Sequence, residues 1–141
     1  MRYDTSRIET VYKLLIKKLP AKLAEEMEGL NVHYLTGLHQ SDREFARCCQ
    51  RPVRIELSVE LNDERRCVIR GILAHEIAHA LVLLGAVDPP DSWRDLEVIE
   101  RHADVVAEKL FGERIYYDDR GVQCSGKGAR GARPRPEGLL R

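Results

Sequence analysis

Hydrophobic and polar positions follow two different periods in the first half of the chain, and each period predicts one kind of element. Apolar residues spaced on one helical face predict a helix over residues 7–28, with a break at Pro20. Ser6 and Glu9 have the spacing of a capping box at its start. Alternation of apolar and polar residues predicts strands at residues 31–37 and 53–59.

The polar stretch between these two strands, residues 38–52, predicts a loop or a short helical turn. After the second strand, Asn62 is the expected N-cap of a long apolar helix that reaches Leu84. Gly85 follows directly, and a glycine at this place is typical of a helix end.

A second long helix is predicted over residues 93–111, with Ser92 opening a capping box and Gly112 ending the helix. Residues 115–117 and 122–124 then predict a hairpin around a turn rich in Asp and Gly. Together these elements predict an α+β fold with more helix than strand. We expect a short mixed sheet to pack on the apolar helix and on the helix that follows it.

Composition suits one globular domain, because 43% of the 141 residues are apolar and 33% are charged. No apolar run is long enough for a membrane span. The charges are uneven: residues 125–141 hold five Lys/Arg and one acid, and the rest of the chain holds 18 basic and 22 acidic residues. We therefore expect a domain at residues 1–124 and a basic, Gly- and Pro-rich tail at residues 125–141.

Candidate chemistry lies in the apolar helix, where the sequence reads His75-Glu76-Ile77-Ala78-His79. Two histidines four residues apart share one helix face, so both imidazoles can reach the same metal ion. Glu76 lies beside that ion, where a carboxylate can take a proton from a bound water. This is the HExxH arrangement of zinc-dependent hydrolases.

A catalytic zinc needs a third protein ligand. A histidine six residues after the second one is excluded, because Gly85 occupies that position. The following helix offers Glu100, which falls beside an apolar stripe made of Leu96, Ala103, Ala107 and Leu110. Asp104, one turn later, is placed to accept a hydrogen bond from a ligand histidine, whereas His102 projects to the opposite side. Acids at such spacings also occur on ordinary solvated helix faces.

The pair formed by His75–His79 and Glu100-Arg101-His102-Ala103-Asp104 resembles the HExxH plus ExxAD pattern of gluzincins, the zinc peptidases with a glutamate as third ligand. The resemblance covers residues 65–115 and is closest to the minimal gluzincins. It implies a small zincin-like domain with one catalytic zinc ion on His75, His79 and Glu100. It also implies Glu76 as general base and acid, Asp104 as the carboxylate behind a ligand, and pairing of the strand at residues 53–59 with an extended substrate. Candidates for stabilising the oxyanion stay open and are Tyr116, Tyr117, His33 and Tyr34.

The expected function is therefore that of a zinc metallopeptidase, an endopeptidase that acts on a peptide or protein substrate. One hypothesis holds that the basic tail keeps it latent, with Cys124 able to reach the zinc. The alternative is a non-proteolytic, zinc-stabilised regulatory or binding module. The body lacks a basic patch with interleaved aromatics, so we do not expect a nucleic-acid partner.

Four cysteines without paired spacing and a start without a signal peptide favour free thiols in a cytoplasmic protein. The adjacent Cys48 and Cys49 could suggest a second metal site, but no partner spacing supports one.

Overall fold

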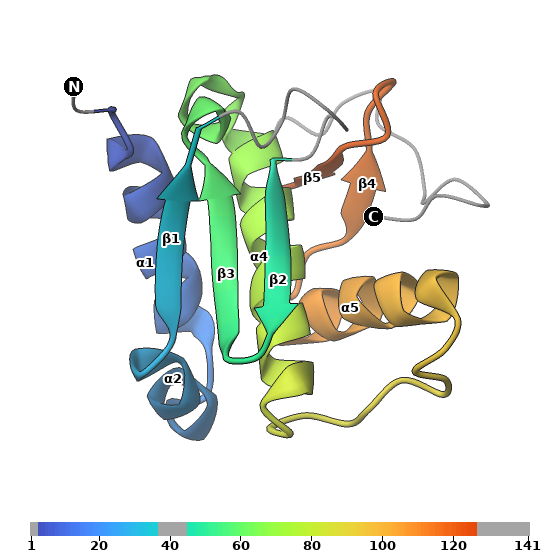
Figure 1. Cartoon of the computed structure of the whole chain (residues 1–141). Helices are drawn as coiled ribbons and strands as arrows, with labels where there is room; N and C mark the ends of the chain where they lie inside the picture. The colour runs from blue at the N-terminus through green and yellow to red at the C-terminus, as the bar shows by residue number, and fades with distance from the viewer. Residues whose placement is uncertain (1–2, 37–44, 127–141) are drawn as a thin grey trace.

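A computed structural model of the chain describes residues 3–36 and 45–126 and has a mixed α+β architecture, as the sequence predicts (Figure 1). The predicted tail from residue 127 onward lies outside the described residues. In chain order the elements are α1 (Ser6–Lys18), α2 (Ala21–Glu28), β1 (Asn31–Leu35), β2 (Ala46–Gln50), β3 (Val53–Ser58), the 3₁₀-helix η1 (Val59–Asp63), α4 (Arg66–Leu83), α5 (Leu96–Phe111), β4 (Ile115–Tyr117) and β5 (Gln123–Ser125).

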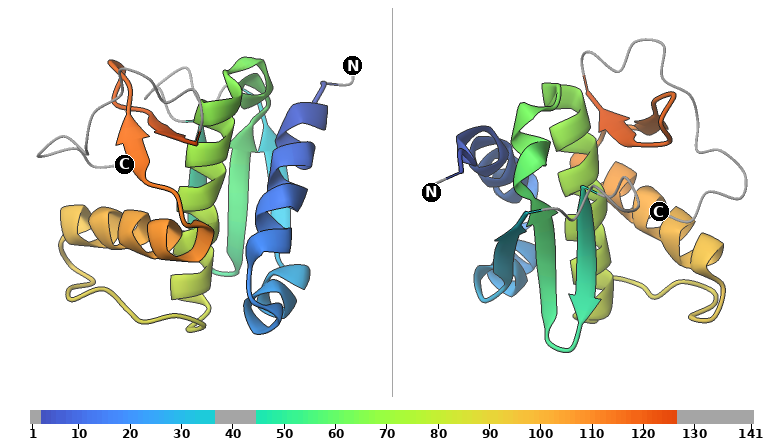
Figure 2. Two further views of the ribbon diagram at one scale, coloured as in Figure 1. Left: turned by 180° about the vertical axis from the view of Figure 1, so that it is seen from behind. Right: turned by 45° about the horizontal axis from the view of Figure 1, so that its top comes forward.

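The apolar helix α4 runs through the centre of the fold. Fourteen of its 18 residues are buried, because the sheet, α1, α5 and β5 all pack against it. The left view of Figure 2 shows α1 and α4 side by side on one face of the three-stranded sheet. β5 approaches α4 closely at Gly71, where an added Cβ would lie 2.6 Å from the Cα of Cys124. The helix ends as predicted, with Gly85 at a φ of 75° in the left-handed region.

The three-stranded sheet has the order β1-β3-β2, with β1 parallel and β2 antiparallel to β3. Ile55 and Leu57 of β3 are fully buried on the face that α4 covers. β2 corrects the sequence prediction, which treated residues 38–52 as a loop or helical turn. Its inward residues, Ala46 and Cys48, are small, and its outward Arg47 is exposed, so the strand lacks the large apolar side chains that make alternation visible.

The position of β3 overturns a second expectation. β3 pairs with β1 on one side and with β2 on the other along its length, so it has no edge left for a substrate. In the part of the chain that the structure describes, β2 has a neighbour on one side only. The amide of Ser58 donates to the carbonyl of Phe45 (2.7 Å). By the antiparallel alternation, Ala46, Cys48 and Gln50 then direct their backbone groups away from β3, toward the open edge.

The helix starts differ from the predictions. Asn62 does not cap α4. It lies in η1, and its Oδ1 accepts from the amides of Arg7 (2.9 Å) and Ile8 (3.1 Å) in the first turn of α1. Ser6 is already inside α1, so the predicted capping box is absent. These differences share one cause: an amide at a helix end donates to any oxygen that the fold brings near it.

α5 starts three residues later than predicted. Asp95 is its N-cap, and the Asp95 carboxylate accepts from the amides of Glu97 and Val98. Ser92 instead accepts from the amides of Arg94 and Asp95 in the preceding turn. The break near Pro20 and the end of α5 at Gly112 are as predicted.

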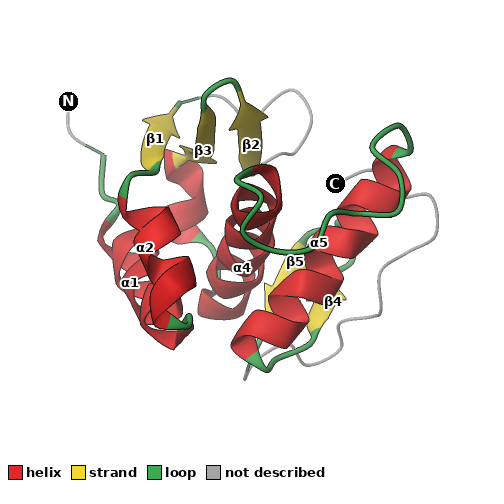
Figure 3. Ribbon diagram, turned by 90° about the horizontal axis from the view of Figure 1, so that it is seen from below, coloured by secondary structure: helices red, strands yellow, loops and turns green. Residues whose placement is uncertain are grey.

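The C-terminal hairpin is present, with Ile115 opposite Ser125 and Tyr117 opposite Gln123. The hairpin and α5 lie together on one side of α4, and α1 and α2 lie on the other side (Figure 3). In the described ranges, no helix combines the length and the apolar character needed to cross a membrane.

Candidate metal centre

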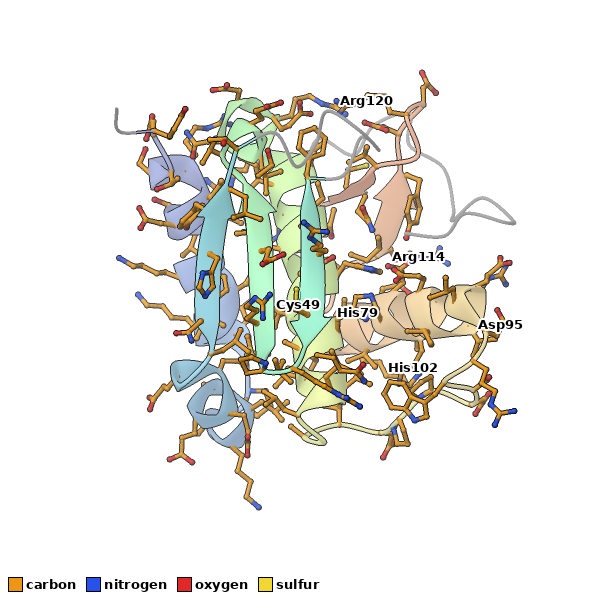
Figure 4. The ribbon with its side chains drawn as sticks, in the orientation of Figure 1. Cys49, His79, Asp95, His102, Arg114 and Arg120 are labelled. Carbon is orange, nitrogen blue, oxygen red and sulfur yellow. The ribbon has the colours of Figure 1, made fainter. Side chains whose placement is uncertain are left out.

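A cavity of about 370 Å³ lies between β2, the second half of α4 and the first half of α5. Figure 4 shows His79 between the edge of β2 and α5. The cavity thus joins the open strand edge to the helix that carries the HExxH sequence. It is lined by Ala46, Arg47, Cys48, Gln50, Glu76, His79, Val82, Leu83, Trp93, Leu96, Ile99 and Glu100.

His79 and Glu100 line this cavity, and the buried His75 contacts Glu100 directly behind its wall. Glu100 Oε2 lies 2.7 Å from Nε2 of His75 and 3.1 Å from Nε2 of His79. The two histidines share one face of α4, and α5 delivers the carboxylate from 21 residues further along the chain. Close approach of the helices is possible because Ala103 and Ala107 of α5, each 1% exposed, fill the interface with small side chains.

The three residues fit a metal ion. One ligand atom from each lies within 4.8 Å of the others, so the group can hold a single ion. Two imidazole nitrogens and one carboxylate oxygen are a ligand set that zinc accepts, leaving a fourth position open. Ligand atoms around a tetrahedral zinc lie roughly 3.3 Å apart, so the observed 2.7 and 3.1 Å need only small outward shifts.

The pKa values of His75 and Glu100 are shifted by their mutual contact. Burial by itself would lower the pKa of His75, but contact with the Asp104 and Glu100 carboxylates raises that pKa well above its ordinary value. Burial would likewise raise the pKa of Glu100, and hydrogen bonds from His75 and His79 instead hold it far below its ordinary value. A divalent cation bound here would place a positive charge between the same three side chains.

Behind His75 lies a second layer of polar contacts. Asp104 Oδ1 is 2.6 Å from Nδ1 of His75. Since a carboxylate accepts, Nδ1 carries the hydrogen and Nε2 is directed to Glu100 and the cavity. The hydroxyl of Tyr117 donates to Oδ2 of Asp104, so both carboxylate oxygens are held. Sequence reasoning placed Asp104 in this position but did not connect Tyr117 with it.

Other residues considered from the sequence lie elsewhere. His102 donates to the carbonyl of Asp88 in the connector, 2.6 Å away, and is not among the cavity residues. Cys124 is fully buried against Gly71 and is not among the cavity residues, so the idea that it reaches the metal is wrong.

The candidates for stabilising the oxyanion are also away from the cavity. Tyr117 is buried behind Asp104, and Tyr116 lines a separate hollow on the other side of α5. His33 and Tyr34 lie in β1, with β3 between them and β2. Among the described residues that line the cavity, none is one of these four candidates. The structure therefore brings no candidate for stabilising the oxyanion to the site.

Sequence reasoning also missed the cavity residues of β2. Cys48 faces Glu76 and Glu100; burial and the charges of these carboxylates raise its pKa above the ordinary value. Its thiol is therefore protonated at neutral pH. No local pattern marks this strand, because its inward residues Ala46 and Cys48 are small.

Comparison of the chain with protein-family models, with curated proteins and with solved structures returned no match. The gluzincin resemblance therefore remains a prediction made from the residues, and the geometry of the site carries the functional argument.

Proposed function

We propose that this chain is a zinc-dependent endopeptidase. The observation that carries the proposal is one cavity, next to the edge of β2, that Glu76, His79 and Glu100 line together. The buried His75 contacts Glu100 from behind this wall, so the three ligand candidates lie within reach of one ion. A structural metal site would not require an acid beside its ligands or a cavity that reaches an unpaired strand.

A zinc ion held by these three residues would supply a water with a pKa near 7 and would polarise a substrate carbonyl. Glu76 is buried, with 6% of its surface exposed, and its side chain lines the cavity. In the proposed reaction, Glu76 takes the proton of the attacking water and transfers it to the leaving amine. Asp104 and Tyr117 hold His75 in one tautomer and one ring orientation throughout.

The edge of β2 supports a peptide as the substrate. Backbone groups of Ala46, Cys48 and Gln50 face the open edge, and they can pair with the main chain of an extended peptide. Such pairing holds any sequence in the cavity, because every peptide has the same backbone donors and acceptors. In this role β2 replaces β3, the strand that the gluzincin resemblance had implied.

The test compares the full-length protein with Glu76→Gln and His79→Ala, each incubated with zinc and an unfolded protein substrate. We expect the Glu76 variant to bind one zinc per chain and to lose at least about 100-fold in cleavage rate. His79→Ala should lose both zinc and cleavage. Zinc-dependent cleavage that survives in Glu76→Gln would refute the proposed role of Glu76.

A chain shortened after Gly126 belongs in the same experiment. The cut is placed there because Ser125 still pairs with Ile115 in the hairpin. Cleavage by the shortened chain alone would support the hypothesis that the basic tail inhibits. Zinc binding without cleavage by either form would favour the alternative, a regulatory or binding module.

A further inference from the structure

One end of the cavity is apolar. Its walls are Val82 and Leu83 at the end of α4, Trp93 in the connector, and Leu96 and Ile99 in α5. Trp93 is 50% exposed and Leu96 is 56% exposed. Leu96 belongs to the apolar stripe predicted to face the core, yet it opens into this cavity. Large apolar side chains left in water beside reactive groups indicate a surface that a ligand covers.

This apolar end has a fixed position relative to the metal site. Val82 and Leu83 lie about one helical turn, or roughly 5 Å, past His79 along α4. β2 and α4 run in the same direction, from top to bottom in Figure 1. Gln50, at the end of β2, therefore lies at the apolar end of the cavity, two residues beyond Cys48. On an extended peptide, this separation corresponds to roughly one to three residues.

We infer that the apolar end is a specificity subsite for a large aliphatic or aromatic side chain, one to three residues on the N-terminal side of the scissile bond. The inference rests on the proposed function. Antiparallel pairing is the commoner and slightly more stable arrangement of two strands. A peptide antiparallel to β2 places its N-terminal residues beside Gln50, because β2 ends there. Its side chains then reach Trp93 and Leu96.

The chemistry of the walls selects against charged side chains. Val82, Leu83, Trp93, Leu96 and Ile99 offer no carboxylate or basic group at this end. A charged side chain would lose its hydration there without gaining a partner. A leucine or phenylalanine instead covers exposed apolar surface, and one such contact changes kcat/KM by roughly 10- to 200-fold.

Trp93 makes the subsite directly observable, since it is the single tryptophan of the chain. The probes are two blocked peptides that differ at one position, Leu against Asp, on the N-terminal side of a mapped cleavage site. They are titrated into full-length, zinc-loaded Glu76→Gln protein. We expect a saturable blue shift of the Trp93 emission with the Leu peptide and at least about tenfold weaker binding of the Asp peptide.

A pair of variants on α5 controls for general effects of the substitution. Leu96 lines the apolar end, whereas Val105, 45% exposed on the same helix, lies outside this cavity. With active protein, Leu96→Ala should lower the preference for Leu over Asp about tenfold. Val105→Ala should leave the preference unchanged.

The outcomes separate this inference from the proposed function. Cleavage without an apolar preference, or with a preference only on the C-terminal side of the scissile bond, would overturn the subsite and leave the peptidase standing. Without cleavage no site is mapped, and the two blocked peptides then differ only by Leu against Asp at one central position of an otherwise identical sequence. A Leu-selective shift that Leu96→Ala abolishes would then support the subsite while the peptidase proposal fails, and no selective shift would overturn the subsite.

Discussion

The hydroxyl of Tyr117, in β4, donates a hydrogen bond to the carboxylate of Asp104, in α5. That carboxylate also contacts His75 on α4. Three elements from different parts of the chain are thus joined behind a candidate metal ligand. Both Tyr117 and Asp104 are buried, so the orientation of His75 depends on residues that do not face the cavity.

Replacing Tyr117 by phenylalanine should weaken zinc binding. The change keeps the ring and removes the donor, so Asp104 holds His75 less firmly. We expect the zinc dissociation constant to rise by about tenfold or more, as measured by competition with a chelating dye. Tyr116→Phe, at the neighbouring position, is the control and should leave the constant unchanged. Equal constants for both variants would show that Tyr117 does not position the ligand.

Glu100→Gln tests the third ligand. An amide oxygen binds zinc less strongly than a carboxylate, so we expect zinc stoichiometry after dialysis to fall well below one per chain. Glu97→Gln is the matched control on the same helix, because Glu97 faces Arg101 and lies outside the cavity. Elemental analysis of the two dialysed proteins gives the answer. Full zinc retention in Glu100→Gln would remove Glu100 from the ligand set.

Asn62→Ala should destabilise the fold without affecting the site. Asn62 is 3% exposed, and its side chain caps α1 from 55 residues away. Losing a cap costs about 1 kcal/mol, and the buried amides left behind add to that cost. We expect the free energy of unfolding in urea to fall by about 1–3 kcal/mol. Zinc affinity at 25 °C should stay unchanged, and a large loss of affinity would contradict this assignment.

The ion pair between Arg70 and Glu113 should make the free energy of unfolding depend on pH in the acidic range. Two hydrogen bonds of 2.7 Å from the Arg70 guanidinium lower the pKa of Glu113, although partial burial opposes the shift. A lowered folded-state pKa stabilises the fold above the ordinary value near 4.5, and this contribution disappears as pH falls through the folded-state pKa.

Glu113→Gln is the variant that measures this contribution. The free energy of unfolding should fall by about 1 kcal/mol at pH 7. The difference from the parent protein should shrink as pH falls below 4.5, because the unfolded carboxylate then binds protons more readily than the folded one. Urea unfolding at both pH values gives the comparison. A difference that is the same at pH 7 and pH 3 would contradict an ionic origin.

The sequence by itself determined the features that depend on local spacing. The apolar run of α4, the place of His75 and His79 on one face, the left-handed Gly85 and Gly112, and the hairpin all follow from short-range periods. Glu100 and Asp104 could be chosen because an acid beside an apolar stripe stands out on a helix. These predictions needed no knowledge of the neighbouring elements.

Tertiary structure decided everything that joins distant segments. Packing leaves one edge of β2 open among the described strands and brings the Asn62 side chain to the first turn of α1. It also brings the Tyr117 hydroxyl to Asp104 and leaves Leu96 exposed at the cavity. In each case, a backbone edge, a helix end, a carboxylate or an apolar surface takes whichever partner the packing brings near it. Local periodicity shows that a group needs a partner, but the partner is determined only when α5 and the sheet pack against α4.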